Sequence, residues 1–239
     1  MTLVAVGSVR GAPGVTTTAL LLASCLDGAV LVEADPAGGV LAVRYGLGRE
    51  PGLTTLAATP ARERARLLEH AQDAGGVPVV VGPDAAEASE ALWRGAGDAL
   101  AAAVRDAGGW VVVDAGRVHR PTAVVRRADL VLLAVHPVAE QLVGATHLVA
   151  SLRGAVDGDV AVMLVGDGPY RAADVETVLD CPVVAHLPDD EATAAHLRDG
   201  RGTRARVARS RLARAVSALA EQVEDLAADP ARRPAEVTR

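Results

Sequence analysis

The 239-residue sequence predicts an α/β fold with three layers: a mostly parallel, twisted sheet of about seven strands, with helices on both faces. Short apolar runs of Val, Leu and Ala alternate with longer helical patterns from end to end. That alternation is typical of parallel strands joined by helices. The strand candidates are continuous apolar runs rather than alternating ones, which indicates strands covered on both faces.

The alternation assigns the expected elements in chain order. The strands are Leu3–Val6, Ala29–Val32, Val77–Val81, Trp110–Val113, Leu130–Val135, Val160–Val165 and Val183–His186. The helices are Thr17–Leu26, Pro60–Ala74, Ala85–Ala107, Ala139–Arg153, Ala172–Leu179, Asp190–Asp199 and Arg204–Ala227. No repeat or linker divides the pattern, so we expect one domain over residues 1–228. Residues 229–239 carry two prolines, many charges and no apolar pattern, which predicts a disordered tail.

The composition excludes several classes of protein. Half of the residues are hydrophobic and 23% are charged, which excludes a collagen, a disulfide scaffold and a fully disordered chain. All 24 Lys and Arg residues are arginine, so no lysine can act as a nucleophile or hold a phosphate. The net charge of −6 argues against bulk nucleic-acid binding but leaves room for a local basic patch.

Cysteine, histidine and hydropathy patterns point to an ordinary soluble chain. Cys25 and Cys181 lie far apart in apolar stretches, so we expect buried free thiols. The six histidines show no metal-ligand spacing. No apolar run reaches the length of about 18 residues that a transmembrane helix needs, and no signal peptide is visible. We therefore expect a cytoplasmic protein.

A glycine-rich loop follows the first expected strand. Ligands of such sheets bind beyond the carboxyl ends of the strands. Between Leu3–Val6 and the next helix the chain reads Gly7-Ser8-Val9-Arg10-Gly11-Ala12-Pro13-Gly14-Val15-Thr16-Thr17. A turn of this kind directs backbone N–H groups and a helix N-terminus at one spot, which suits a phosphate. Thr16 would then be a helix cap or a Mg²⁺ ligand. The alternative is a tight turn with a threonine cap.

Acidic residues end two further strands. Glu33 and Asp35 follow Ala29–Val32, and at this spacing two carboxylates can orient water or hold Mg²⁺ through water. The alternative is a solvated turn in which Asp and Pro end the strand. Asp114 follows Trp110–Val113, which has the general form of the Mg²⁺-holding second motif of P-loop NTPases.

Residues 10–17 carry a family resemblance. They read Arg-Gly-Ala-Pro-Gly-Val-Thr-Thr and resemble the deviant phosphate-binding loop Lys-Gly-Gly-x-Gly-Lys-Thr-Thr of the ParA/MinD family of P-loop ATPases. The loop matches at Gly11, Gly14, Thr16 and Thr17. Arg10 stands at the signature lysine, which in the family reaches the partner subunit's nucleotide, and Val15 stands at the main phosphate lysine. The resemblance runs from about Leu3 to Ala227 and implies the P-loop NTPase fold.

The resemblance implies a nucleotide site with ATP and Mg²⁺ as cofactors. Thr16 and Asp114 would hold Mg²⁺, Asp35 would orient the attacking water, Glu33 would be the substituted first acid, and Arg10 would act across a homodimer. The nucleotide would contact Gly11, Ala12, Pro13, Gly14, Val15, Thr16 and Thr17. Relatives carry an Asn after the strand that corresponds to Val160–Val165, where it contacts the base. This chain has no Asn, so Asp167 is the candidate there, whereas Asp129 is expected to be structural.

The substitution at Val15 bears on activity. A charged hydrogen bond is worth about 1.5–3 kcal/mol, so its loss lowers affinity by about 10- to 100-fold. Hydrolysis should suffer more, because the lysine also offsets charge during phosphoryl transfer. We therefore expect weak or absent ATPase activity.

The last expected helix begins with an arginine-rich segment. Arg204, Arg206, Arg209, Arg211 and Arg214 could contact DNA or an anionic surface, and the alternative is a helix docked on the sheet with a solvated basic face.

Three hypotheses remain open. The first is a ParA/MinD-like pseudo-ATPase or very slow ATPase. It would be a positioning or scaffold factor with a protein partner, in chromosome partitioning, septum placement or the localisation of secretion or pilus machinery. The second is an active ATP-dependent dimerising switch of the same type. The third is an unrelated α/β protein that binds another phosphorylated ligand.

Overall fold

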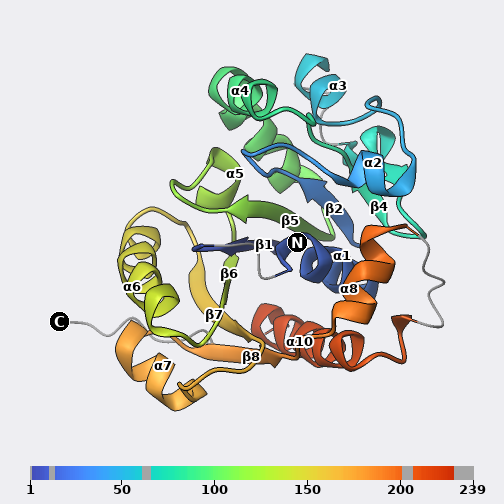
Figure 1. Cartoon of the computed structure of the whole chain (residues 1–239). Helices are drawn as coiled ribbons and strands as arrows, with labels where there is room; N and C mark the ends of the chain where they lie inside the picture. Colours follow the sequence, from blue (N-terminus) through green and yellow to red (C-terminus); the bar gives the residue numbers. More distant parts are fainter. Residues whose placement is uncertain (1, 11–13, 61–65, 201–206, 229–239) are drawn as a thin grey trace.

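A computed structural model describes residues 2–10, 14–60, 66–200 and 207–228 of the chain (Figure 1). Its centre is an eight-stranded sheet with the order β3-β4-β2-β5-β1-β6-β7-β8. Every neighbouring pair is parallel except β3 and β4. The strands are β1 (Thr2–Ser8), β2 (Val30–Glu33), β3 (Gln72–Asp73), β4 (Pro78–Val80), β5 (Trp110–Arg117), β6 (Leu130–Val135), β7 (Asp159–Val165) and β8 (Val183–Leu187).

Helices cover both faces of the sheet, so the expected three-layer α/β architecture is confirmed. One hydrophobic cluster joins the sheet to α3 (Leu53–Ala58), α4 (Ala86–Asp106), α5 (Ala123–Arg126), α6 (Ala139–Arg153) and α7 (Ala172–Leu179). A second cluster joins the other face to α1 (Val15–Cys25), α2 (Leu41–Tyr45), α8 (Glu191–Arg198) and α10 (Arg211–Ala228). The strands carry Val, Leu and Ala on both faces because both faces are buried.

The helix expected at Pro60–Ala74 is wrong in its described part. Leu67–His70 forms the short 3₁₀ helix η2, and β3 follows as the eighth strand. Gly75 and Gly76 both adopt a positive φ, which turns the chain back so that β3 pairs antiparallel with β4. Residues 61–65 lie outside the described residues.

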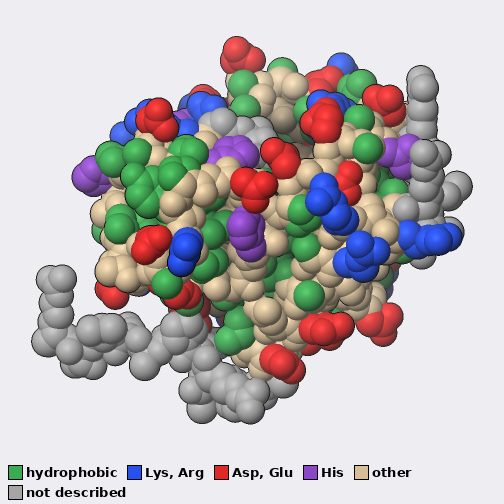
Figure 2. Space-filling model, turned by 60° about the horizontal axis from the view of Figure 1, so that its bottom comes forward, with side chains coloured by type: hydrophobic (Ala, Val, Ile, Leu, Met, Phe, Trp, Pro, Cys, Tyr) green, Lys and Arg blue, Asp and Glu red, His purple; other side chains and the backbone are tan. Residues whose placement is uncertain are grey.

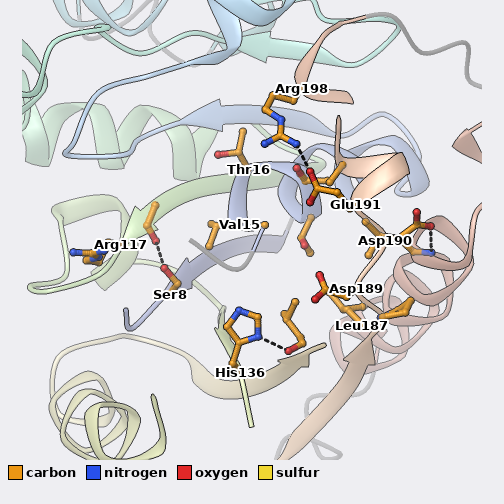
Figure 3. Close-up of a pocket in the computed structure, with 18 of the residues that line it drawn as sticks. Ser8, Val15, Thr16, Arg117, His136, Leu187, Asp189, Asp190, Glu191 and Arg198 are labelled. Atoms are coloured by element: carbon orange, nitrogen blue, oxygen red, sulfur yellow. Dashed lines mark hydrogen bonds and ion pairs between the residues drawn. The ribbon is translucent and has the colours of Figure 1, made fainter. Parts of the chain in front are cut away.

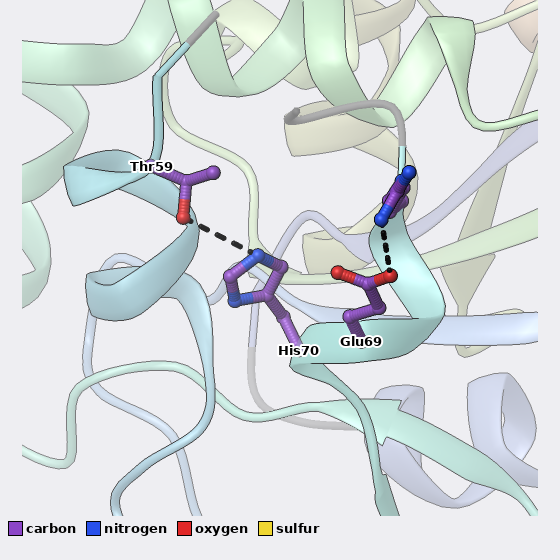
Figure 4. A network of polar contacts seen from close by, with 4 residues as sticks. Thr59, Glu69 and His70 are labelled. Atoms are coloured by element: carbon purple, nitrogen blue, oxygen red, sulfur yellow. Dashed lines mark hydrogen bonds and ion pairs between the residues drawn. The ribbon is translucent and has the colours of Figure 1, made fainter. Parts of the chain in front are cut away.

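A polar network holds η2 in place, as Figure 4 shows. The Nδ1 atom of His70 lies 3.0 Å from the Thr55 hydroxyl oxygen, and its Nε2 atom lies 3.4 Å from the Thr59 hydroxyl oxygen. Arg66 and Glu69 form an ion pair at 3.1 Å within the same turn. The ring of His70 therefore ties η2 to α3, and this tertiary contact replaces the expected helix.

Other boundaries also differ from the expectation. The strand expected at Trp110–Val113 continues to Arg117, so Asp114 lies inside β5. The last helix begins at Arg211, after turns and bends at residues 208–210. Cys181 is buried as expected, but Cys25 is exposed, because it is the last residue of α1. Asp129 is structural as expected: its carboxylate accepts a hydrogen bond from Leu3 N at 2.8 Å and pairs with Arg105 at 2.9 Å.

Candidate functional site

A cleft of about 700 Å³ lies at the carboxyl edge of the sheet. Its walls come from the ends of β1, β5, β6, β7 and β8, the first turn of α1, and α8 (Figure 3). The register explains why side chains meet here, because Asp114 pairs with Val6 of β1 and Glu33 pairs with Asp114. The volume lies within the range of small-molecule sites, about 300–1,000 Å³.

The N-terminus of α1 opens into this cleft. Gly14 precedes the helix in the left-handed conformation, with φ of 67°, and as a glycine it offers no side chain to cap the helix. The first N–H groups of a helix have no partner within the helix, and the dipole places positive potential beside them. This arrangement suits an anion such as a phosphate. Gly11, Ala12 and Pro13 lie outside the described residues.

Val15 lines the cleft but is only 3% exposed and belongs to the hydrophobic cluster beneath the sheet. Thr16 and Thr17 also line the cleft. The cationic side chains among the lining residues are arginines: Arg44, Arg117 and Arg198. Arg198 is paired with Glu191 at 2.8 Å.

Thr16 and Asp114 meet at the base of the cleft, where their side chains form a hydrogen bond. Asp114 is 1% exposed, and its Oδ1 atom also accepts a hydrogen bond from Gly116 N at 3.1 Å. Burial raises the pKa of Asp114 to about 7, and the carboxylates of Glu33 and Asp35 add to the shift, while the bonds from Thr16 and Gly116 oppose it.

The donor set at this point fits Mg²⁺ bound to a phosphate. One hydroxyl and one carboxylate are the hard oxygen ligands that Mg²⁺ prefers. Within the described part of the chain, no three His, Cys, Asp or Glu side chains are grouped so that they could hold a metal ion by themselves. Magnesium commonly takes its other ligands from water and substrate phosphates, and the uncapped helix end lies beside the pair.

Asp35 lies beside this pair and over Gly116. A Cβ atom on Gly116 would come within 2.0 Å of Asp35 Cγ, and Gly116 has a φ of +56°. Asp35 Oδ1 accepts a hydrogen bond from Ala37 N at 2.8 Å. Burial raises the pKa of Asp35, and the charge of Arg117 partly opposes this. The side chain therefore lies in the cleft wall with one oxygen held by the backbone.

Glu33 has a different role from Asp35. Its side chain is buried, at 1% exposure, and accepts hydrogen bonds from Val40 N at 2.6 Å, Leu41 N at 2.8 Å and Gly82 N at 3.1 Å. These bonds satisfy backbone donors at the start of α2 and after β4. Burial raises the pKa of Glu33, and the backbone bonds oppose the shift. Glu33 therefore stabilises the loop after β2 through hydrogen bonds to its backbone.

Arg10 lies outside the cleft, on a neighbouring groove of about 580 Å³ that Arg117, His119 and His147 also line. Its backbone oxygen accepts a hydrogen bond from Gln141 Nε2 at 3.0 Å. A Cβ on Gly144 of α6 would lie 3.5 Å from Arg10 Nε. The Arg10 side chain therefore passes over α6 at a glycine, where the helix carries no side chain.

The far end of the cleft contains His136, which the sequence analysis did not single out as a site residue. His136 follows β6 and Asp189 follows β8, and both line the cleft. Asp167, the expected base contact, is exposed and is not among the described residues that line it. His136 stands directly after a strand, so the strand-edge rule could have found it.

The described arginines of the basic segment lie at the start of α10 or just before it. Arg209, Arg211 and Arg214 are exposed, whereas Arg204 and Arg206 lie outside the described residues. The second half of α10 carries Glu221, Glu224 and Asp225. Figure 2, which looks at this side of the molecule, shows arginine side chains gathered at the right and acidic side chains along the lower edge. In the described residues, no helix has the length and apolar character needed to cross a membrane.

Comparisons with known proteins agree on the fold. No family model and no curated protein matches this sequence. Among solved structures, the cell division ATPase MinD of Pyrococcus furiosus is 20% identical, with a TM-score of 0.76 over 94% of this chain and 99% of that chain. A ParA family ATPase from Chlorobium tepidum TLS is 16% identical, with a TM-score of 0.76 over 93% and 98%.

A third structure holds a ligand. The septum site-determining protein MinD from Pyrococcus horikoshii OT3, complexed with Mg-ADP, is 18% identical, with a TM-score of 0.73 over 95% of this chain and 97% of that chain. At these identities the likeness establishes the fold. The chain has the fold of the MinD and ParA ATPases.

Proposed function

We propose that this chain is a divergent ParA/MinD-like protein that binds a Mg²⁺–nucleotide in the cleft and hydrolyses it very slowly or not at all. One observation carries the proposal: the Thr16–Asp114 pair stands at a helix N-terminus that Gly14 leaves without a side-chain cap. Val15, which the resemblance aligns with the phosphate lysine, is buried and uncharged. The protein would act as a positioning or scaffold factor. The MinD neighbours are a cell division ATPase and a septum site-determining protein, which supports a role of this kind.

Different residues of the cleft would bind the phosphates, the Mg²⁺ ion and the water. The first turn of α1 would receive the phosphates, and Thr16 Oγ1 and Asp114 would hold Mg²⁺. The metal ion, when bound, neutralises phosphate charge and orients the phosphate oxygens. Asp114 must lose its proton to act as a ligand, so metal binding should release a proton near neutral pH. Asp35 would orient water at the mouth of the site.

A cation that hydrolysis would need at the phosphates is missing from this site. Transfer of a phosphoryl group depends on cations that neutralise charge in the transition state. Val15 supplies none, and Arg198 is engaged with Glu191. Arg44 and Arg117 remain in the lining, but a guanidinium does not replace a compact ammonium at the phosphates. Slow or absent turnover follows.

Partners would bind around the site. We propose that the protein forms a homodimer or binds a protein partner, with Arg10 and Arg117 at the contact, since both line the open groove beside the cleft. Arg209, Arg211 and Arg214 would contact DNA or another anionic surface.

An active dimerising switch is the second candidate. The presence of Asp35 beside the Thr16–Asp114 pair favours it, because the side chains that would position Mg²⁺ and water are all in this chain.

Calorimetric titration of the full chain with nucleoside triphosphates and Mg²⁺ tests the proposal. ATP, GTP and ADP are titrated into the wild type, Thr16→Ala and the control Thr177→Ala, which changes an exposed threonine on α7. We expect micromolar binding that Thr16→Ala abolishes and Thr177→Ala retains. If no nucleotide binds at millimolar concentration, the proposal fails and the third reading, another phosphorylated ligand, gains support.

A turnover assay separates the two candidates. If the wild type is silent and Val15→Lys hydrolyses the nucleotide, only the lysine is missing and the pseudo-ATPase is supported. If the wild type turns over rapidly by itself, the active switch is correct.

A further inference from the structure

Two arginine side chains line one wall of the cleft, although they come from separate helices. Arg44 lies in the last turn of α2, Arg198 is the last residue of α8, and both line the same cleft as Thr16. In the view of Figure 3 the guanidinium of Arg198 lies between Thr16 and Glu191. The wall made by α2 and α8 therefore adds positive charge to the potential at the start of α1.

A glycine brings the ends of α2 and α8 together. Gly200 follows α8 with a φ of +62°, a conformation that residues with a side chain rarely adopt. A Cβ on Gly200 would lie 2.2 Å from the backbone oxygen of Arg44, so the chain after α8 passes directly against the end of α2. This close approach places Arg44 and Arg198 on neighbouring segments of the backbone.

The partner of Arg198 in this structure holds it weakly. The Nη2 atom of Arg198 donates to Glu191 Oε1 at 2.8 Å, and the two side chains are 52% and 83% exposed. The residues are seven positions apart, so the side chains must span about 10 Å of helix to meet. Exposed ion pairs gain little, because water competes and two long side chains lose freedom. A phosphate, which carries more charge than a carboxylate, can therefore displace Glu191 from Arg198.

Arg44 is available without any exchange. Within the described ranges its guanidinium makes no hydrogen bond or ion pair, and its side chain is partly exposed. Its charge acts at a distance on the buried Glu33 carboxyl, which backbone N–H groups already bind. A guanidinium has five N–H donors and no acceptor, so it suits an incoming anion.

The other acids that line the cleft are not bound to these arginines. Asp35 accepts from a backbone N–H after β2, Asp190 caps α8, and Asp189 lies beside Gly166 after β7. Among the described lining residues, Glu191 is therefore the acid that an incoming anion must displace.

We propose that Arg44 and Arg198 bind the terminal phosphate of a nucleoside triphosphate, and that Arg198 exchanges Glu191 for this phosphate when the nucleotide binds. The inference rests on the nucleotide binding proposed above and names the cations that hold the phosphate in a chain without lysine. Arginine forms paired hydrogen bonds with phosphate oxygens. These arginines supply affinity and not turnover, because Val15 still leaves the start of α1 without a compact ammonium.

The effect should appear as a difference between triphosphates and diphosphates. A hydrogen bond between charged groups changes affinity by about 10-fold or more. A diphosphate lacks the terminal phosphate, so ATP should bind about 10-fold more tightly than ADP, and GTP about 10-fold more tightly than GDP. The ratio should be similar for both bases, because the proposed contacts do not involve the base.

Exchange of single charges gives the sharpest test, because the two members of the ion pair should act in opposite directions. The wild type, Arg198→Gln, Arg44→Gln and Glu191→Gln are titrated with ATP, ADP, GTP and GDP in the presence of Mg²⁺. We expect each arginine variant to lose about 10-fold in triphosphate affinity and less than about 3-fold in diphosphate affinity. Glu191→Gln should bind triphosphates more tightly than the wild type, because Arg198 no longer has to leave a carboxylate. Its diphosphate affinity should stay unchanged.

A second exposed ion pair provides matched controls. Arg153 and Asp180 lie 3.1 Å apart, with side chains 43% and 73% exposed, and neither lines the cleft. Arg153→Gln and Asp180→Asn should keep the four wild-type affinities. Arg117→Gln tests the remaining arginine of the cleft. If this variant removes the preference for triphosphates while Arg198→Gln and Arg44→Gln keep it, the assignment is overturned.

The outcomes distinguish the two proposals. If Arg198→Gln and Arg44→Gln keep the wild-type ratio of triphosphate to diphosphate affinity, the arginine assignment fails while nucleotide binding stands. If Glu191→Gln does not tighten triphosphate binding, the proposed exchange is overturned. If no nucleotide binds at all, both proposals fail. The wild-type ratio uses no variant, so a ratio near one overturns the inference even if a variant does not fold.

Discussion

Replacement of Asp114 by asparagine should make the metal-free protein more stable at high pH and leave its stability unchanged at low pH. Asp114 is buried, and its pKa is about 7 in the folded chain against 3.8 for an unperturbed aspartate. The asparagine has almost the same shape, and its side-chain oxygen can still accept from Gly116 N. It removes the charge that a buried site disfavours.

Proton linkage determines whether the stability of the wild type rises or falls with pH. Between about pH 4 and pH 7 the unfolded chain has released this proton and the folded chain has kept it, so wild-type stability falls as pH rises. A pKa change from 3.8 to about 7 corresponds to about 4 kcal/mol once both states are ionised. For a domain of this size that is a rise in Tm of roughly 8–16 °C for Asp114→Asn above pH 8.

Urea unfolding in EDTA at several pH values from 4 to 8.5 measures the difference. Asp225→Asn, an exposed exchange of the same type, should match the wild type throughout. A constant difference between Asp114→Asn and the wild type at every pH, or one that grows toward pH 4, would refute the reasoning. With Mg²⁺ and nucleotide restored, the wild type should gain stability and the variant should not.

Three further predictions concern parts of the molecule around the cleft. Gly116→Ala should lower the free energy of unfolding in urea by at least about 1 kcal/mol, because the new Cβ would collide with the Asp35 carboxylate at a position of positive φ. Combining Gly116→Ala with Asp35→Ala should recover part of this loss. No recovery would contradict the contact. Asp129→Ala should cost about 2–3 kcal/mol in the same assay, since it leaves the Leu3 N–H without its carboxylate partner. In native protein, a disulfide reagent should modify exposed Cys25 alone. Burial raises the pKa of the Cys181 thiol to about 11, so Cys181 should react only after unfolding. Equal reaction rates for both thiols would contradict the burial of Cys181.

The sequence predicted the parallel core and part of the site, because both follow from short patterns. A continuous apolar run predicts a buried strand, and the residue after it lies at the carboxyl edge of the sheet. Thr16, Asp35 and Asp114 were singled out in that way, and the register brings them together. The same rule does not tell which direction a side chain takes. Glu33 is the last residue of β2 and Asp35 comes two residues later, yet the Glu33 side chain turns inward to backbone N–H groups.

What the sequence could not predict depends on tertiary contacts. The helix expected at Pro60–Ala74 has a helical composition, but its described part is governed by the contacts of His70 with α3 and by the Gly75–Gly76 turn. Helices α2 and α5 are four or five residues long, too short for a periodic pattern to be recognised. Asp189 differs from its neighbours Asp190 and Glu191 only in lacking a described partner, and a row of acids does not reveal this.

The position of β1 in the sheet determines the order in which the protein can assemble during synthesis. Strand β1 leaves the ribosome before β5 and β6, the strands with which it pairs, which begin at residues 110 and 130. At about 5–20 residues per second, β1 waits several seconds for its neighbours. The helix that covers α1, α10, emerges near residue 211. Until then an apolar strand and an apolar helix face are exposed together, so the yield of folded protein should depend on chaperones and on the rate of translation.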